Sequence, residues 1–129
     1  RIKCLCWMSD CWGALSELPA KSILEGNDIF IEFKGALTEQ YVLQQLISDT
    51  PYTPYYYGTE KATFEQDFLI QKEDAIIPIE VKAETNIRSQ SLKAYYDKFH
   101  PEKAVRFSTL KYMDQEWMVN IPLYAVCNL

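Results

Sequence analysis

Two apolar segments joined by a short charged link constrain the fold of this chain most. The segments are residues 62–71 (ATFEQDFLIQ) and 75–83 (AIIPIEVKA), and the link between them is KED. Their β-branched and aromatic residues are typical of strands. Strands connected by so few residues pair antiparallel. The sequence therefore predicts a β-hairpin that closes near Glu73 and Asp74.

Helices are predicted on either side of this hairpin. Apolar residues recur at helical spacing over residues 33–47, which indicates an amphipathic helix. A second helix is predicted over residues 89–101, with Ser89 or Ser91 as N-cap and Pro101 at its end. The remaining strand-like or apolar runs are residues 54–59, 103–110, 117–122 and 123–127. The order helix, three strands, helix, strand predicts an α/β fold with one antiparallel portion.

Composition limits the domain number and the partners. A chain of 129 residues with 48% hydrophobic residues suits one compact domain. The net charge of -5 repels a polyanion, so a nucleic-acid site requires a local basic patch or a metal-neutralised groove. Four cysteines and one histidine, His100, lack paired ligand spacing, and no zinc site is expected. Neither a membrane helix nor a signal peptide is apparent, and we expect a soluble, cytoplasmic protein without membrane contact.

Residues 1–12 have an anomalous composition. Their run CLCWMSDCW combines three cysteines with two tryptophans and fits neither a helix nor a strand pattern. If the coding DNA is read one nucleotide earlier, codon pairs such as Cys6-Trp7 are forced to specify Leu, and an apolar segment results. We interpret this run as a frameshift upstream of Gly13, with a genuine N-terminal arm as the alternative. Residues 13–129 are then the single domain.

A cluster of charged side chains on the hairpin points to chemistry. Glu80 and Lys82 lie two apart on the second strand and therefore project from one face, while the hairpin brings Asp67 close to Glu80. Neighbouring carboxylates repel each other unless a cation lies between them, and Mg²⁺ or Mn²⁺ prefers such oxygen ligands. A lysine beside the metal can assist an attacking water and stabilise a phosphate. Glu39, in the first helix, is a candidate fourth member.

This arrangement resembles the E, D, ExK signature of the PD-(D/E)XK nuclease superfamily. The resemblance implies a restriction-endonuclease-like αβββαβ core, in which helices flank a central mixed sheet. It also implies that Glu39, Asp67, Glu80 and Lys82 are catalytic, with Asp67 and Glu80 as ligands of Mg²⁺ or Mn²⁺ and nucleic acid as the substrate.

A narrower resemblance involves longer stretches of sequence. The runs FKGALTEQYVLQQL, EQDFLI, PIEVKAETNIRSQSLKAY and NIPLYAV are similar to the C-terminal domain of unknown function of bacterial AAA-type ATP-binding proteins. This similarity covers nearly everything from Gly13 onward, and it implies an ATPase module as partner in the intact protein. The phosphate-binding pattern GxxxxGK[ST] does not occur, so the chain itself is not expected to hydrolyse ATP.

Other interpretations stay open for these residues. Glu80 and Lys82 could form an exposed ion pair, and the cluster could be a relic in a non-catalytic docking domain of an ATPase. Tyrosines 55–57 could stack on bases or pack against a helix. Basic residues gather near the second helix, where they could contact phosphate or form a solvated face. These residues are Lys93, Lys98, His100, Lys103 and Arg106.

Overall fold

The computed structural model describes residues 28–58, 66–83 and 88–129, with side chains from Lys34 onward. The proposed frameshift segment lies outside these residues. The helices are α3 (Asp28–Asp49), α4 (Gln90–Phe99) and the 3₁₀ helix η1 (Leu123–Asn128). The strands are β1 (Tyr55–Tyr57), β2 (Gln66–Lys72), β3 (Ala75–Lys82), β4 (Ala104–Ser108), β5 (Met113–Asp114) and β6 (Met118–Pro122).

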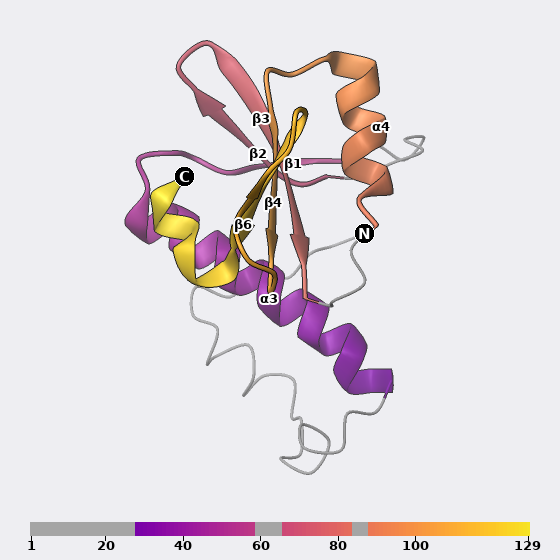
Figure 1. Ribbon diagram of the computed structural model, residues 1–129. Helices are drawn as coiled ribbons and strands as arrows, with labels where there is room; N and C mark the ends of the chain where they lie inside the picture. The colour runs from indigo at the N-terminus through magenta and orange to yellow at the C-terminus, as the bar shows by residue number, and fades with distance from the viewer. Residues whose placement is uncertain (1–27, 59–65, 84–87) are drawn as a thin grey trace.

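These strands form one mixed sheet in the order β1-β2-β3-β4-β6-β5. The pairs β1–β2, β2–β3 and β5–β6 are antiparallel, whereas β3–β4 and β4–β6 are parallel. Figure 1 shows the sheet nearly edge-on, with α4 on one side and with α3 and η1 on the other. The predicted α/β class and its αβββαβ order are confirmed. The sequence pattern did not reveal the two-residue strand β5.

The β2–β3 hairpin closes as predicted. Glu73 and Asp74 form its turn, and Glu73 adopts a left-handed backbone with φ 55°. Lys72 pairs with Ala75, and the register continues to Phe68 and Ile79. Because side chains alternate along a strand, this register fixes the face on which every hairpin residue lies.

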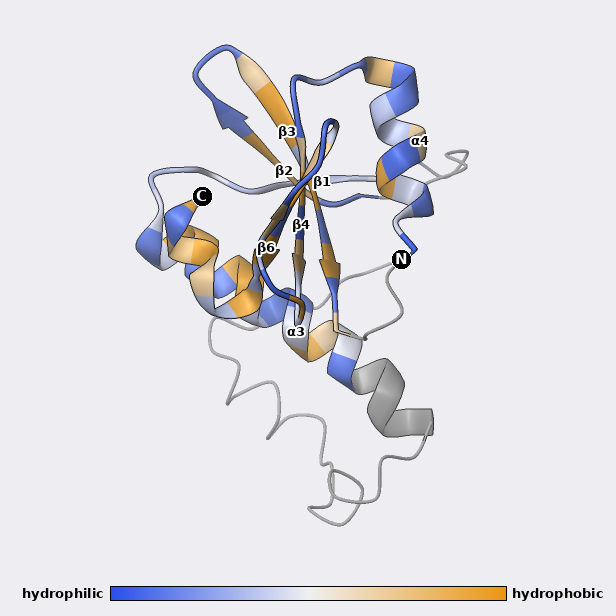
Figure 2. Ribbon diagram, viewed as in Figure 1, coloured by the Kyte–Doolittle hydropathy of each residue, from blue (hydrophilic) through white to orange (hydrophobic). Residues whose placement is uncertain are grey.

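The larger core lies between the sheet and α3. Val42, Leu43 and Leu46 contribute the apolar side of α3, and Figure 2 shows hydrophobic residues of α3 and η1 facing the strands. Alternate residues of the four central strands meet them, as does Val126 of η1. These strand residues are Phe68, Ile70, Ile79, Val81, Val105, Phe107 and Ile121.

The opposite face of the sheet is more polar and lies under α4. Leu92 of α4 packs with Ala104 and Met118 in a second, smaller cluster. Helix α4 begins after Ser89, whose side chain makes no capping bond, and ends at His100 in a left-handed conformation with φ 47°. A left-handed residue ends a helix by turning the chain away from its axis. The predicted second helix is thus confirmed, with its end one residue before Pro101.

Within the described ranges, no helix is both long and apolar enough to span a membrane.

Candidate functional site

Asp67 and Glu80 lie at neighbouring positions on the adjacent strands β2 and β3. Phe68 and Ile79 are paired across the β2–β3 hairpin and belong to the core on the α3 side. Glu80 follows Ile79 on β3, so its side chain projects from the opposite face, under α4, whereas Asp67 precedes Phe68 where β2 shifts its register with β1. The structure therefore brings the two predicted metal ligands to neighbouring positions.

A hydrogen bond fixes the carboxylate of Asp67. Strand pairing between β2 and β3 ends at Phe68 and Ile79, and beyond that point the backbone N–H of Val81 donates to Asp67 Oδ2 at 2.8 Å. The side chain thus replaces a backbone acceptor where the strands separate. This contact gives Asp67 a structural role in addition to any chemical one.

Glu80 is a buried carboxylate. Only 5% of the residue is exposed, and Oε1 lies 3.4 Å from Nζ of Lys82, whose side chain is 35% exposed. Its other oxygen, Oε2, is buried without a hydrogen-bond partner. The ion pair of the alternative interpretation is therefore present, but its carboxylate is buried rather than exposed. An oxygen that is removed from water and receives no donor is costly, and a cation is one means of compensation.

A positively charged residue lies beside Glu80 on the next strand. Arg106 is paired in register with Glu80 and is itself 5% exposed. Burial lowers the pKa of Arg106, and the negative charge of Glu80 partly offsets that effect. Arg106 Nε donates to Asn120 Oδ1 at 2.9 Å, and Nη1 donates to Ser89 Oγ at 3.1 Å. Ser108 Oγ also donates to Asn120 Oδ1, at 2.7 Å.

The sequence reasoning missed this network. Arg106 and Asn120 are single polar residues inside the apolar strands VRF and VNI. A polar residue at such a position, on a strand covered on both faces, requires a buried partner. A single polar residue within each apolar strand was therefore the feature of the sequence that could have revealed this network.

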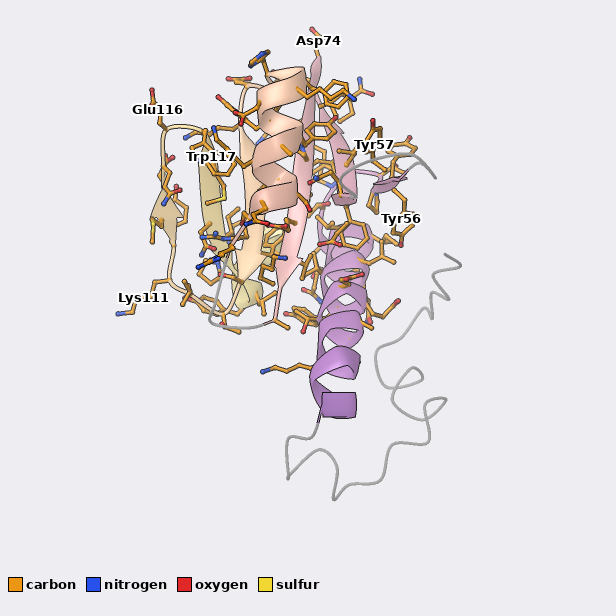
Figure 3. The ribbon with its side chains drawn as sticks, turned by 90° about the vertical axis from the view of Figure 1, so that its right-hand side faces the viewer. Tyr56, Tyr57, Asp74, Lys111, Glu116 and Trp117 are labelled. Atoms are coloured by element: carbon orange, nitrogen blue, oxygen red, sulfur yellow. The ribbon has the colours of Figure 1, made fainter. Side chains whose placement is uncertain are left out.

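Glu39 and Asp67 both influence the phenol of Tyr56. Glu39 is half-buried on α3, and the ring of Tyr56 lies 5.4 Å from that of Phe68 on β2. Burial, followed by the negative charges of Glu39 and Asp67, raises the pKa of Tyr56 to about 12. Both carboxylates therefore act on one phenol, where β1 and α3 meet (Figure 3).

The carboxylates do not form a three-ligand metal centre. In the part of the chain that the structure describes, no three His, Cys, Asp or Glu residues are grouped so that they could hold a metal ion. Mg²⁺, however, commonly uses one or two carboxylates and completes its shell with water. Asp67, together with the buried and unpartnered Glu80 Oε2, fits that smaller donor set.

Comparison with known sequences assigns a family. The family described as a domain of unknown function, DUF4143, matches residues 34–125. This chain belongs to the DUF4143 family. The match includes all four predicted catalytic residues, Glu39, Asp67, Glu80 and Lys82. No curated protein and no solved structure matches the chain.

Three of the predicted basic residues of this DUF4143 domain contact acidic or aromatic side chains, and the fourth is buried. Lys93 pairs with Asp97 at 2.8 Å and lies over the ring of Trp117, with 4.9 Å between Nζ and the ring centroid. Lys103 pairs with Asp114, and Lys98 lies over Phe99. Arg106 is buried on β4, so the expectation that it extends an exposed basic surface is wrong.

The three tyrosines of β1 in this DUF4143 domain have different surroundings. Tyr57 makes edge contacts with Tyr95 and Phe99 of α4, at 5.5 and 6.1 Å between ring centroids. Tyr55 is 59% exposed and Tyr56 44% exposed. Packing against a helix, one of the two interpretations of these tyrosines, therefore applies to Tyr57.

Proposed function

We propose that this DUF4143 domain is a divalent-cation-dependent phosphodiesterase that acts on nucleic acid, as PD-(D/E)XK nucleases do. The observation that carries the proposal is the buried Glu80 Oε2, which has no hydrogen-bond donor and belongs to a residue next to Asp67 of the adjacent strand. The αβββαβ order, with Glu80 and Lys82 on β3, supports the same assignment.

Each residue has a role in this proposal. Asp67 and Glu80 would hold Mg²⁺ or Mn²⁺, which when bound activates water and offsets charge on a phosphate. Lys82 has a partly exposed ammonium beside Glu80, suited to orienting that water or contacting a phosphate oxygen. Glu39, whose charge reaches Tyr56 together with that of Asp67, would orient the ligands.

The proposal also accommodates the acidic net charge of -5. A polyanion would approach a groove neutralised by a cation rather than a broad basic surface. The similarity to the C-terminal domain of bacterial AAA-type ATP-binding proteins further suggests that an ATPase module delivers the substrate.

Calorimetric titration with Mn²⁺ and Mg²⁺ tests the metal site. We expect binding at millimolar concentration to the parent protein and a loss of at least about tenfold in affinity in Glu80→Gln, because one of two anionic ligands becomes neutral. Glu102→Gln, which removes an exposed carboxylate, is the matched control and should bind like the parent. Absence of binding to the parent would refute the metal site.

A nicking assay on single- and double-stranded DNA and RNA tests the chemistry. Lys82→Met should retain cation binding and lose cleavage, since Lys82 is not a proposed ligand. Cleavage that persists unchanged in Lys82→Met, or in the presence of EDTA, would contradict the proposal.

A second candidate is a non-catalytic docking domain of an AAA-type ATPase. One observation favours it: Lys82 Nζ lies 3.4 Å from Glu80 Oε1, so the carboxylate already has a cationic partner without any metal. On this account Asp67→Asn and Glu80→Gln, made in the intact protein, leave its function unchanged. A complementation assay with both variants separates the two candidates.

A further inference from the structure

Two buried side-chain oxygens of the sheet have no hydrogen-bond donor. In the part of the chain that the structure describes, Gln66 Oε1 and Glu80 Oε2 are the buried side-chain oxygen or nitrogen atoms without a hydrogen-bond partner. Gln66 is 3% exposed and Glu80 is 5% exposed. Burial of such an oxygen without a donor is costly. Two of them on adjacent strands indicate a ligand that supplies donors or positive charge.

Helix α4 sets the orientation of the Gln66 amide. Gln66 Nε2 donates to the backbone oxygen of Ser91, in the first turn of α4, at 3.0 Å. A backbone carbonyl only accepts hydrogen bonds, so the amide nitrogen and not the amide oxygen must face Ser91. Gln66 Oε1 is therefore an acceptor, and it is held beside α4 by the bond that its own amide nitrogen makes.

The start of α4 also covers Glu80. Ser91 accepts from Gln66 on β2, and Ser89 Oγ accepts from Arg106 Nη1 on β4 at 3.1 Å. Strand β3 lies between β2 and β4, and Glu80 on β3 is in register with Arg106. The segment that begins α4 thus spans β3 at the level of Glu80, whose side chain projects toward α4. Both oxygens consequently lie in the layer between the sheet and the start of α4.

The neighbouring charge favours a cation as the shared ligand. Asp67 is the residue after Gln66 on β2 and is the neighbour of Glu80 across the hairpin. Amide and carboxylate oxygens are both hard ligands of the kind that divalent cations bind. A buried water could also donate to two acceptors, but it would not offset the charge of the carboxylates.

We propose that Gln66 Oε1 is a third oxygen ligand of the divalent cation that Asp67 and Glu80 hold. This inference rests on the proposed phosphodiesterase and extends its metal site. With Gln66 the donor set contains three oxygens, although only two of them come from carboxylates. Because Gln66 Nε2 is bonded to Ser91, the same side chain connects the cation to α4.

Mn²⁺ titration of Gln66→Met tests the ligand. This variant keeps the length of the side chain and removes the amide. It should bind Mn²⁺ about tenfold more weakly than the parent, the effect expected when a polar contact with a charged group is lost. Gln71→Met is the matched control and should bind like the parent. Gln71, on the same strand, also donates from Nε2 to a backbone oxygen, that of Glu73, but is exposed.

The variant Gln66→Glu distinguishes a ligand from a residue that only holds α4. Like Gln66→Met, its ionised side chain cannot donate to Ser91, but it offers a carboxylate oxygen. It should bind Mn²⁺ at least as tightly as the parent, because affinity rises with the charge of the ligands. Binding as weak as that of Gln66→Met would overturn the inference. If Gln66→Glu does not fold in EDTA, Mn²⁺ should restore its folding, and failure to fold with Mn²⁺ overturns the inference as well.

Urea unfolding in EDTA provides the remaining comparison. A buried water shared by the two oxygens would make Gln66→Met less stable in EDTA and leave its Mn²⁺ affinity unchanged. Unchanged Mn²⁺ affinity in Gln66→Met, with a parent that binds, therefore overturns the third ligand and leaves the phosphodiesterase standing. Absence of Mn²⁺ binding in the parent refutes the proposed metal site itself.

Discussion

Substitution of Asp67 separates its structural role from its chemical one. In the structure Oδ2 accepts the N–H of Val81 at 2.8 Å, where β2 and β3 cease to pair. Asp67→Asn keeps an oxygen that can accept this bond, whereas Asp67→Ala leaves the N–H without an acceptor. The two variants remove the same negative charge and differ in whether the N–H of Val81 keeps an acceptor.

The expected changes in the free energy of unfolding follow from the hydrogen bond between Val81 N–H and Asp67. A hydrogen bond to a charged group contributes about 1.5–3 kcal/mol, and one between neutral groups about 0.5–1.5 kcal/mol. Asp67→Asn should therefore lower the free energy of unfolding by about 1 kcal/mol. Asp67→Ala should lower it by about 2–3 kcal/mol, because Val81 N–H also loses its acceptor in a buried strand. For a chain of 129 residues, each kcal/mol corresponds to roughly 4 °C in Tm.

Urea unfolding and Mn²⁺ calorimetry on the same protein preparations provide the assay. Both variants should lose Mn²⁺ binding to a similar extent and should differ in unfolding midpoint, with Asp67→Ala the less stable. Asp74→Asn is the control, since Asp74 lies exposed at the tip of the β2–β3 hairpin (Figure 3). Equal stability of the Asn and Ala variants would refute the structural reasoning.

Three further predictions concern the core, the hairpin turn and Tyr56. Phe68 is 1% exposed, and Phe68→Ala should lower the free energy of unfolding by about 3–5 kcal/mol. Tyr124 is 82% exposed, and Tyr124→Ala should change this free energy little. Chemical denaturation of both variants measures the difference. Glu73→Gly should raise stability by about 0.5–1 kcal/mol, because Gly adopts φ 55° without steric cost; an unchanged Tm would contradict this. The pKa of Tyr56 is raised from 10.0 to about 12, so the stability that its protonated phenol contributes is fully present below pH 10.0 and is lost as pH rises through about 12. Urea unfolding from pH 9 to 12.5 should show this loss in the parent, and Tyr56→Phe should show a smaller one, because burial also raises the pKa of Tyr95.

Much of the fold could be predicted from local sequence pattern. The hairpin follows from two strand-like runs separated by KED, and α4 follows from helical spacing that ends before Pro101. The parallel pairing of β3 with β4 could not be predicted in this way. Those strands are separated by α4, and their register is set by packing on both faces of the sheet rather than by a turn.

The sequence predicted which residues form the candidate site but not what surrounds them. Alternation along β3 placed Glu80 and Lys82 on one face, and the hairpin register added Asp67. Whether that face is exposed depends on α4, which covers it by a tertiary contact that no local pattern encodes. Burial is therefore what distinguishes Glu80 in the structure, a buried carboxylate paired with Lys82, from the exposed ion pair that was the alternative interpretation.

The same dependence on tertiary contacts explains why Arg106 was wrongly predicted to belong to a basic surface. Read along the chain, it follows Lys98, His100 and Lys103 and resembles one more member of a basic surface. Read across the sheet, it is the residue paired with Glu80, on a strand whose five residues are all buried. A charge on such a strand requires polar partners inside the fold, because both faces of the strand are covered. The charge of Arg106 is therefore to be interpreted through its hydrogen bonds to Asn120 and Ser89 and its place beside Glu80, and not as part of a basic surface.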